Sequence, residues 1–345
     1  MAFQRFNPEN DVVENQRTTI SSGLWTGGSS TLTGFFTQSS NGNITGSVLE
    51  LYNVDPNTDT SAETQIAVGY ANIHGSGSAG NTTKLTTGGR QTAALYRQFR
   101  NVILAPNTDE FSFTGAPSSS DDFYFISFQR ARQREKIDPG NWELKLSGNM
   151  PALFLDDKIS LIDDSGATTN PTVNQGGRVF NVVSGSITNG IHTAAADEAA
   201  GNMGSYGLFY PDLGIILLNA PKLEISGGLG VHDRAADQHI SRSEAFFDSI
   251  VSGSSFTARR EEEISSTNYF VRVNNKNFNF SSNPTYATAS DGSLTQATFF
   301  KDPKTFITQV GLYNDDNELL AIAKLSKPVL KSYSREAIIK VKLDF

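Results

Sequence analysis

Three glycines of the chain have the literal spacing of a dinucleotide-binding fingerprint. Gly75, Gly77 and Gly80 occupy the positions of G-x-G-x-x-G, whose glycines let a pyrophosphate reach the N-terminus of the helix that follows. Residues 81–89 read NTTKLTTGG, which does not favour a helix, and a P-loop would need Lys-Ser/Thr directly after Gly80. We therefore interpret the segment as a surface loop and expect no bound nucleotide cofactor.

A second segment begins like a calcium loop, with oxygen-bearing side chains at Asp55, Asn57, Asp59 and Ser61. The sixth position of that loop is Thr60 instead of Gly, and the twelfth is Ile66 instead of Glu. We therefore favour a loop of Asx turns over a metal site. The four histidines have no metal-ligand spacing and are interpreted as surface or turn residues: His74, His192, His232 and His239. We expect no metal.

Acidic residues cluster at Asp121-Asp122, Asp156-Asp157, Asp163-Asp164 and Glu261-Glu262-Glu263. A glycosidase needs two carboxyl groups facing each other across a cleft. These clusters lie beside turn signals, where solvated carboxylates are ordinary. A Ser–His–Asp triad is adjacent only in space, so the sequence leaves it open, but there is no nucleophile-elbow motif. We expect a protein that is not an enzyme.

The densest basic patch is the candidate protein interface. Arg130, Arg132 and Arg134 alternate at strand spacing and Lys136 continues the series, which predicts four cations on one strand face. The plain interpretation is a solvated face. The alternative is an electrostatic contact with an acidic neighbouring subunit, because like charges on one face repel unless something answers them.

The composition limits the remaining classes of function. The 345 residues carry a formal net charge of −8, so we expect no nucleic-acid partner, because phosphate binding needs clustered Lys and Arg. There is no Cys, which excludes disulfides and thiolate metal sites. The N-terminus lacks the apolar stretch of a signal peptide, and the longest apolar run, residues 214–218, is too short to cross a membrane. We expect no membrane insertion.

Turn-rich strand patterns dominate the chain and predict a mainly β protein, a β-sandwich or mixed β assembly with one or two flanking helices. Residues 1–50 read as an extended N-terminal arm or irregular strands, and residues 51–345 as a β-rich body. Apolar periodicity predicts helices over 92–104 and 237–251. Strands are predicted at 123–129, 142–147, 158–163, 178–183, 208–218 (turning at Pro211-Asp212), 269–273, 306–313, 318–325 and 336–345. In the last strand, Ala337, Ile339, Val341, Leu343 and Phe345 alternate with polar residues and are predicted to face inward.

Several short segments resemble virion structural proteins of tailed phages, especially the marine T-even-like myoviruses that infect cyanobacteria. They are residues 6–11 (FNPEND), 134–142 (REKIDPGNW, similar to a strand–turn–strand signature with Pro-Gly at the turn), 206–217, 278–285 (FNFSSNPT), and 311–325 with Pro328. The C-terminal strand–Pro–strand ending in Phe also resembles the end of a T-even baseplate wedge protein.

The resemblance implies a structural component of a contractile phage tail, in the baseplate and of the wedge type. Such a protein would be assembled in the host cytoplasm and would contact other tail proteins in multiple copies around the tail axis. A receptor-binding or fibre-attachment module is the first alternative, although no shaft repeat of fixed period is present. A tail-associated glycosidase is the second.

Overall fold

The structure is a computed structural model that describes residues 4–37, 48–75, 91–108, 110–116, 119–147, 158–167, 171–191, 204–226, 239–288 and 291–344. It confirms the mainly β class with few helices. The chain divides into two compact units: unit 1 is Met1–Thr19 with Glu263–Phe345, and unit 2 is Ile20–Glu262. Neither boundary coincides with the division expected at residue 50. The chain passes between the units twice, within β1 (Val12–Gly23) and within β14 (Phe256–Val273).

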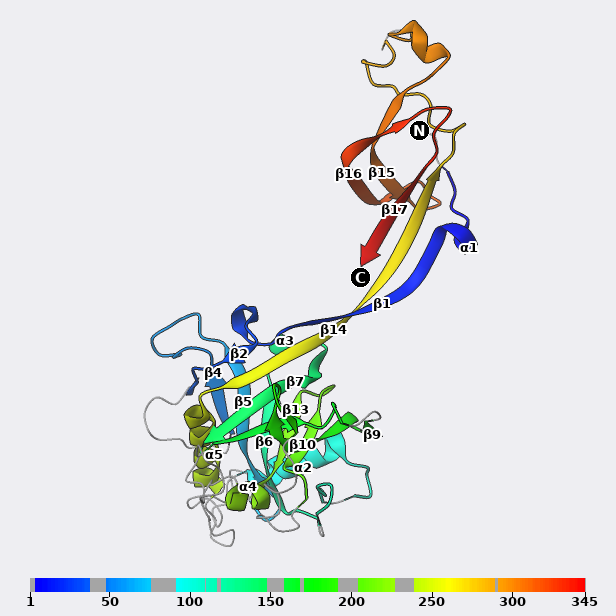
Figure 1. Ribbon diagram of the computed structural model, residues 1–345. Coiled ribbons are helices and arrows are strands. Elements are labelled where there is room, and N and C mark those ends of the chain that lie inside the picture. The colour runs from blue at the N-terminus through cyan, green and yellow to red at the C-terminus, as the bar shows by residue number, and fades with distance from the viewer. Residues whose placement is uncertain are drawn as a thin grey trace. The chain divides into compact units, whose positions relative to one another are not determined.

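Unit 2 is built on one antiparallel sheet (Figure 1). Its strands pair in the order β7 (Lys136–Ser147), β8 (Lys158–Asp163), β10 (Gly177–Ser186), β12 (Gly207–Tyr210), β13 (Ile215–Asn219), β6 (Asp122–Phe128), β5 (Thr64–Asn72), β4 (Val48–Tyr52) and β3 (Phe36–Thr37). The first residues of β14 pair with β7 and with β2 (Thr31–Leu32), and β9 (Thr172–Asn174) and β11 (Gly190–Ile191) flank β10.

Strand β6 is buried on both faces, which explains its almost uninterrupted apolar sequence. Tyr124, Ile126 and Phe128 point into one core, which also contains Phe246 of α5 (His239–Gly253). Phe123 and Phe125 lie in a second core, together with Tyr96 of α2 (Thr92–Ile103). Alternation along the strand therefore places one helix on each face of the sheet.

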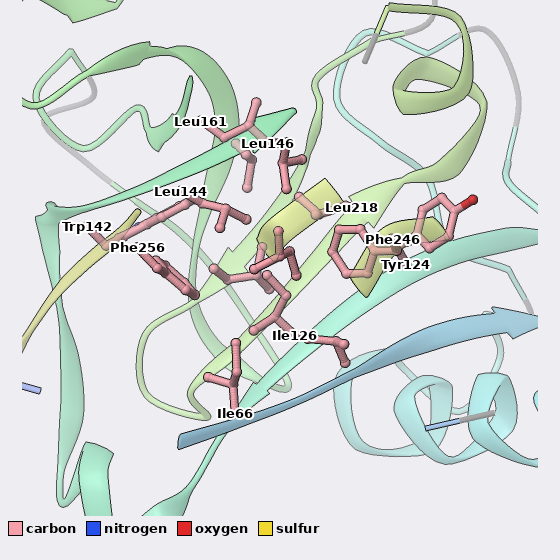
Figure 2. Close-up of a cluster of buried hydrophobic side chains, with 14 of the residues drawn as sticks. Ile66, Tyr124, Ile126, Trp142, Leu144, Leu146, Leu161, Leu218, Phe246 and Phe256 are labelled. Atoms are coloured by element: carbon pink, nitrogen blue, oxygen red, sulfur yellow. The ribbon is translucent and has the colours of Figure 1, made fainter. Parts of the chain in front are cut away.

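The sheet curls around the first core, and Figure 2 shows buried side chains of that core. Helix α5 packs against both β5 and β7, although five other strands separate these two in the sheet. Three aromatic rings also join distant strands of the sheet. The ring of Phe256, at the start of β14, lies 5.6 Å from the ring of Phe128 on β6. The ring of Trp25 lies 5.1 Å from that of Phe256 and 6.1 Å from that of Phe128. In the close-up, Phe256 and Trp142 lie on one side of the cluster, and Tyr124 and Phe246 on the other.

Most elements predicted from periodicity are present. The two expected helices are α2 and α5, and the expected turn at Pro211-Asp212 joins β12 to β13. The Pro139-Gly140 turn is different: β7 runs through it as one strand. The register against β14 changes there from Trp142↔Ala258 to Ile137↔Arg260, so several residues of β7 bulge out of the pairing and the chain does not reverse. Gly140 has a φ of 79°, and its N–H donates to buried Asp163 at 2.8 Å.

Unit 1 joins the second part of β14 to β17 (Ala337–Asp344) and to the hairpin of β15 (Thr305–Tyr313) and β16 (Leu319–Lys331). Val310 and Leu312 of the hairpin form a small core with Val341 of β17. Ile339 and Leu343 pack against this core while Lys340 and Lys342 are exposed, so the alternation predicted for this strand is confirmed. Phe345 lies outside the described residues.

The N-terminal segment, expected to be an extended arm, has partners within unit 1. A one-turn helix, α1 (Pro8–Asp11), precedes β1. The carboxylate of Asp11 accepts hydrogen bonds from the backbone N–H of Asn7 at 2.9 Å and from Nε of Arg272 at 2.6 Å. The ring of Phe6 lies 5.6 Å from the ring of Tyr269.

Candidate functional site

The basic segment does not form the strand face that its spacing predicted. Residues Arg130–Gln133 form the one-turn helix α3, Arg134 follows with a φ of 58°, and only Lys136 lies in a strand, at the start of β7. Gln133 decides this conformation. It is 1% exposed, and its Nε2 donates to the backbone carbonyl of Asp212 at 3.1 Å. One turn of helix buries Gln133 under the β12–β13 turn, so the arginines beside it do not alternate as in a strand.

Three of the four cations are paired within unit 2. Arg132 lies 3.0 Å from the Glu63 carboxylate and donates to the Thr26 hydroxyl at 3.2 Å. Arg134 Nη1 donates to both carboxylate oxygens of Glu262, at 3.0 and 3.1 Å. Lys136 Nζ lies 3.4 Å from Glu261. The acidic run of β14, which the sequence indicated was merely solvated, therefore neutralises much of the basic segment.

Arg130 is the exception in this segment. It is exposed, and its side chain forms no ion pair with any residue that the structure describes. The contact with an acidic neighbouring subunit therefore remains a prediction, and Arg130 alone of the four has its charge available for one. The other three cations have a structural role. Arg134 and Lys136 bind the segment to β14, and Arg132 binds it to the end of the β4–β5 connection.

A further ion pair fixes the turn that covers Gln133. The guanidinium of Arg178 donates to both carboxylate oxygens of Asp212, at 2.8 and 3.3 Å, and its backbone N–H donates to one of them at 3.1 Å. Burial alone would raise the pKa of Asp212. The hydrogen bonds and positive charge of Arg178 outweigh burial, so this pKa lies below its ordinary value.

Buried charged side chains of unit 2 form a cluster that sequence reasoning missed. Arg242 of α5 is fully buried. Its Nη1 lies 2.6 Å from Glu224 on the short helix α4 (Ala220–Ser226) and 3.4 Å from Asp122 of β6. The Tyr70 hydroxyl donates to Asp122 at 2.6 Å, and burial followed by the Asp122 charge raises the pKa of Tyr70. Burial likewise raises the pKa of Tyr124, whose hydroxyl donates to Glu224 at 3.4 Å.

This cluster joins α4, α5, β5 and β6. Two carboxylates and one guanidinium satisfy one another there, and both tyrosines stay protonated as donors. These contacts give the cluster a structural role, because they fix α5 to α4 and β6 inside the curled sheet. In the sequence, Asp122 is recognisable only as half of an acidic pair. No local pattern marks its partners, because Tyr70 lies 52 residues before it and Arg242 lies 120 residues after it.

The structure also describes several of the remaining sequence motifs. The Asx turns are confirmed: the backbone N–H groups of Asn57 and Ser61 donate to Asp55 and Asp59, at 3.0 and 2.8 Å. Exposed His74 lies 3.4 Å from exposed Asp121. Several of the other motif residues lie outside the described residues: His192, His232, Asp156-Asp157 and residues 76–90 of the glycine-rich loop. The side chain of His239 also lies outside them. Within the described ranges, no group of three or more His, Asp or Glu is arranged to hold a metal, and no helix is long and apolar enough to cross a membrane.

Exposed apolar side chains are concentrated in unit 1. Ten of the seventeen large apolar residues that are exposed in the described part of the chain belong to this unit, which has less than a third of the sequence. They are Val13, Phe278, Phe280, Phe300, Phe306, Leu319, Leu320, Ile322, Tyr333 and Ile338. Half of them lie on β15, β16 and β17, and none of those five belongs to the unit 1 core.

Comparison with known proteins identifies no relative: no family model, no curated protein and no solved structure matches this chain.

Proposed function

We propose that this protein is a non-enzymatic structural component of a contractile phage tail, in the baseplate region, and that it assembles through protein–protein contacts. Two observations support the proposal. The first is the set of short segments that resemble phage virion proteins. The second, which carries more physical weight, is the apolar surface of unit 1.

Monomeric proteins rarely expose large contiguous apolar patches, because each exposed side chain loses the free energy of burial. In unit 1, five of the ten lie on the β15–β16 hairpin and on β17: Phe306, Leu319, Leu320, Ile322 and Ile338. A protein that functions within a larger assembly would bury them against its neighbours. The described ion pairs of unit 2 are explained by its own packing and give no support to an enzymatic alternative.

Locating the chain in intact particles tests the proposal. Antibodies against the protein, applied to purified particles of the phage that encodes it, should label the baseplate. Particles made without the protein should have defective tails, and a plasmid copy should restore them. Labelling of fibre tips with normal tail assembly would favour the receptor-binding alternative. Absence of the protein from purified particles would exclude a structural role in the virion.

A further inference from the structure

The β15–β16 hairpin has an outer face that its own unit does not cover. Ala321 and Ala323 of β16 pack against the unit 1 core, so the alternate residues Leu320, Ile322 and Lys324 point away from it. Leu320 is 68% exposed and Ile322 is 54% exposed. We call these three residues the β16 outer face.

A glycine lies opposite Ile322 on the neighbouring strand. Gly311 is the cross-strand partner of Ile322 and has no side chain to cover it. A Cβ at Gly311 would lie 2.9 Å from the ring of Tyr313 and 3.3 Å from Leu319, so these side chains close around the glycine. The result is an apolar surface with a positive edge. Neither Lys324 nor the exposed Lys327 forms an ion pair with a described carboxylate.

The charge of the chain is divided unequally between the units. Unit 1 has 12 basic and 11 acidic residues, a net charge of +1, whereas unit 2 has 16 basic and 25 acidic residues, a net charge of −9. Within residues 319–344 there are six Lys or Arg and only two acids. The excess of negative charge that could attract a basic edge of unit 1 therefore lies in unit 2 of the same protein.

The best complement on unit 2 is the outer face of β4 and β3. Leu49 and Leu51 of β4 are buried in the curled sheet, so Val48 and Glu50 face outward. Phe36 of β3, the cross-strand partner of Tyr52 on β4, is also exposed. Residues 48–63 contain four acids and no Lys or Arg, and of these acids Glu63 is already paired with Arg132. Hydrogen bonds from the Asn57 backbone and from the Ser61 hydroxyl, respectively, are the main causes that lower the pKa values of Asp55 and Asp59, so both carboxylates stay ionised at neutral pH.

We propose that the β16 outer face of one copy docks on the β4 outer face of a second copy. Leu320 and Ile322 would pack against Phe36 and Val48, while Lys324 lies near Glu50. The two surfaces differ, so the contact is heterologous and joins copies head to tail into a ring or an open chain. This self-association does not depend on whether the protein belongs to a phage tail.

Sedimentation velocity of the full chain over a range of concentrations is the primary test. Wild-type protein should associate as concentration rises, and 0.5 M NaCl should weaken the association because it screens the charges at the edge. The double variant Ile322→Ser, Lys324→Glu should raise the concentration at half-association at least tenfold. Ile338→Ser, Lys340→Glu is the matched control, because it changes the same residue types at exposed positions of β17. The control should associate like wild type.

A mixing experiment identifies the partner surface. Lys324→Glu alone and Glu50→Lys alone should each be largely monomeric, but their equimolar mixture should associate, because each supplies the intact surface that the other lacks. Wild-type protein that is monomeric at every concentration overturns the proposal. So does a Glu50→Lys variant that associates normally, since the occupant of the β16 outer face would then be another surface or a different protein.

Discussion

Arg130 and Arg132 stand two residues apart on α3 and have different surroundings. Arg132 contacts Glu63 and Thr26, whereas Arg130 points to solvent. We expect Arg132→Gln to lower the free energy of unfolding by about 1 kcal/mol, because a partly exposed ion pair and one hydrogen bond are lost. Arg130→Gln should change it by less than about 0.5 kcal/mol, as surface substitutions usually do. Urea unfolding measures both, and equal effects would contradict the pairing described for Arg132.

The Arg178–Asp212 pair predicts a dependence on pH. The pKa of Asp212 is depressed in the folded protein, so its ionised form stabilises the fold above the ordinary value near 3.8. That contribution is lost as pH falls through the folded pKa. Asp212→Asn should therefore melt at a lower temperature than wild type at pH 7, and the difference should shrink below pH 3.8. Calorimetry of the two proteins at matched pH values tests this, and a constant difference would show that the Asp212 charge is unimportant.

Helix α5 depends on its buried arginine for its position in the sheet. Arg242→Met would leave Asp122 and Glu224 buried without their cation. Breaking a buried ion pair in this way typically costs about 3–5 kcal/mol, so we expect the variant to unfold at a much lower urea concentration or to fail to fold. Asp248→Asn, on an exposed position of the same helix, is the control and should behave like wild type. A stable Arg242→Met protein would show that the apolar residues of α5 suffice to hold it.

Strand β17 should be essential to unit 1 and dispensable for unit 2. It pairs with β14 along eight residues and contributes Val341, Ile339 and Leu343 to the small core. Burial of such side chains contributes up to about 1.5–3 kcal/mol each, against a domain stability of about 5–15 kcal/mol. Deletion of residues 336–345 should remove hydrogen-exchange protection from β15 and β16, while β5 and β6 keep theirs. Unchanged protection in β15 and β16 would show that β17 is peripheral.

Across the whole molecule, the two units should unfold separately, because each has its own hydrophobic core. Buried Lys331 is a selective probe of unit 1. Its Nζ donates at 2.9 Å to the backbone carbonyl of Asn275, the side chain of Asn279 and the carbonyl of Ser332. Lys331→Met leaves these acceptors unpaired, which costs about 1–3 kcal/mol. In calorimetry, Lys331→Met should lower one transition and Arg242→Met the other. A single transition shifted by both variants would mean that the units unfold together.

Local pattern was sufficient for much of this fold. In the strand predicted at 142–147, Trp142, Leu144 and Leu146 alternate with polar residues, and the structure buries all three completely. The helical periodicity of residues 92–104 and 237–251 and the alternation of residues 337–343 were equally informative. In each case the apolar residues repeat with the period of the backbone, and burial of one face rewards that period.

Tertiary structure determined the conformation of the basic segment that was the candidate interface. Charged side chains can reach water from a helix, a turn or a strand, so their spacing in residues 130–136 did not determine the backbone there. The burial of Gln133 under a turn some 80 residues later did. The same reason hid the Arg242 cluster, because α4, α5 and β6 meet only when the sheet curls. Sequence alone determined which segments bury a face, and only the folded chain decided which charges meet, because Coulomb attraction depends on distance in space.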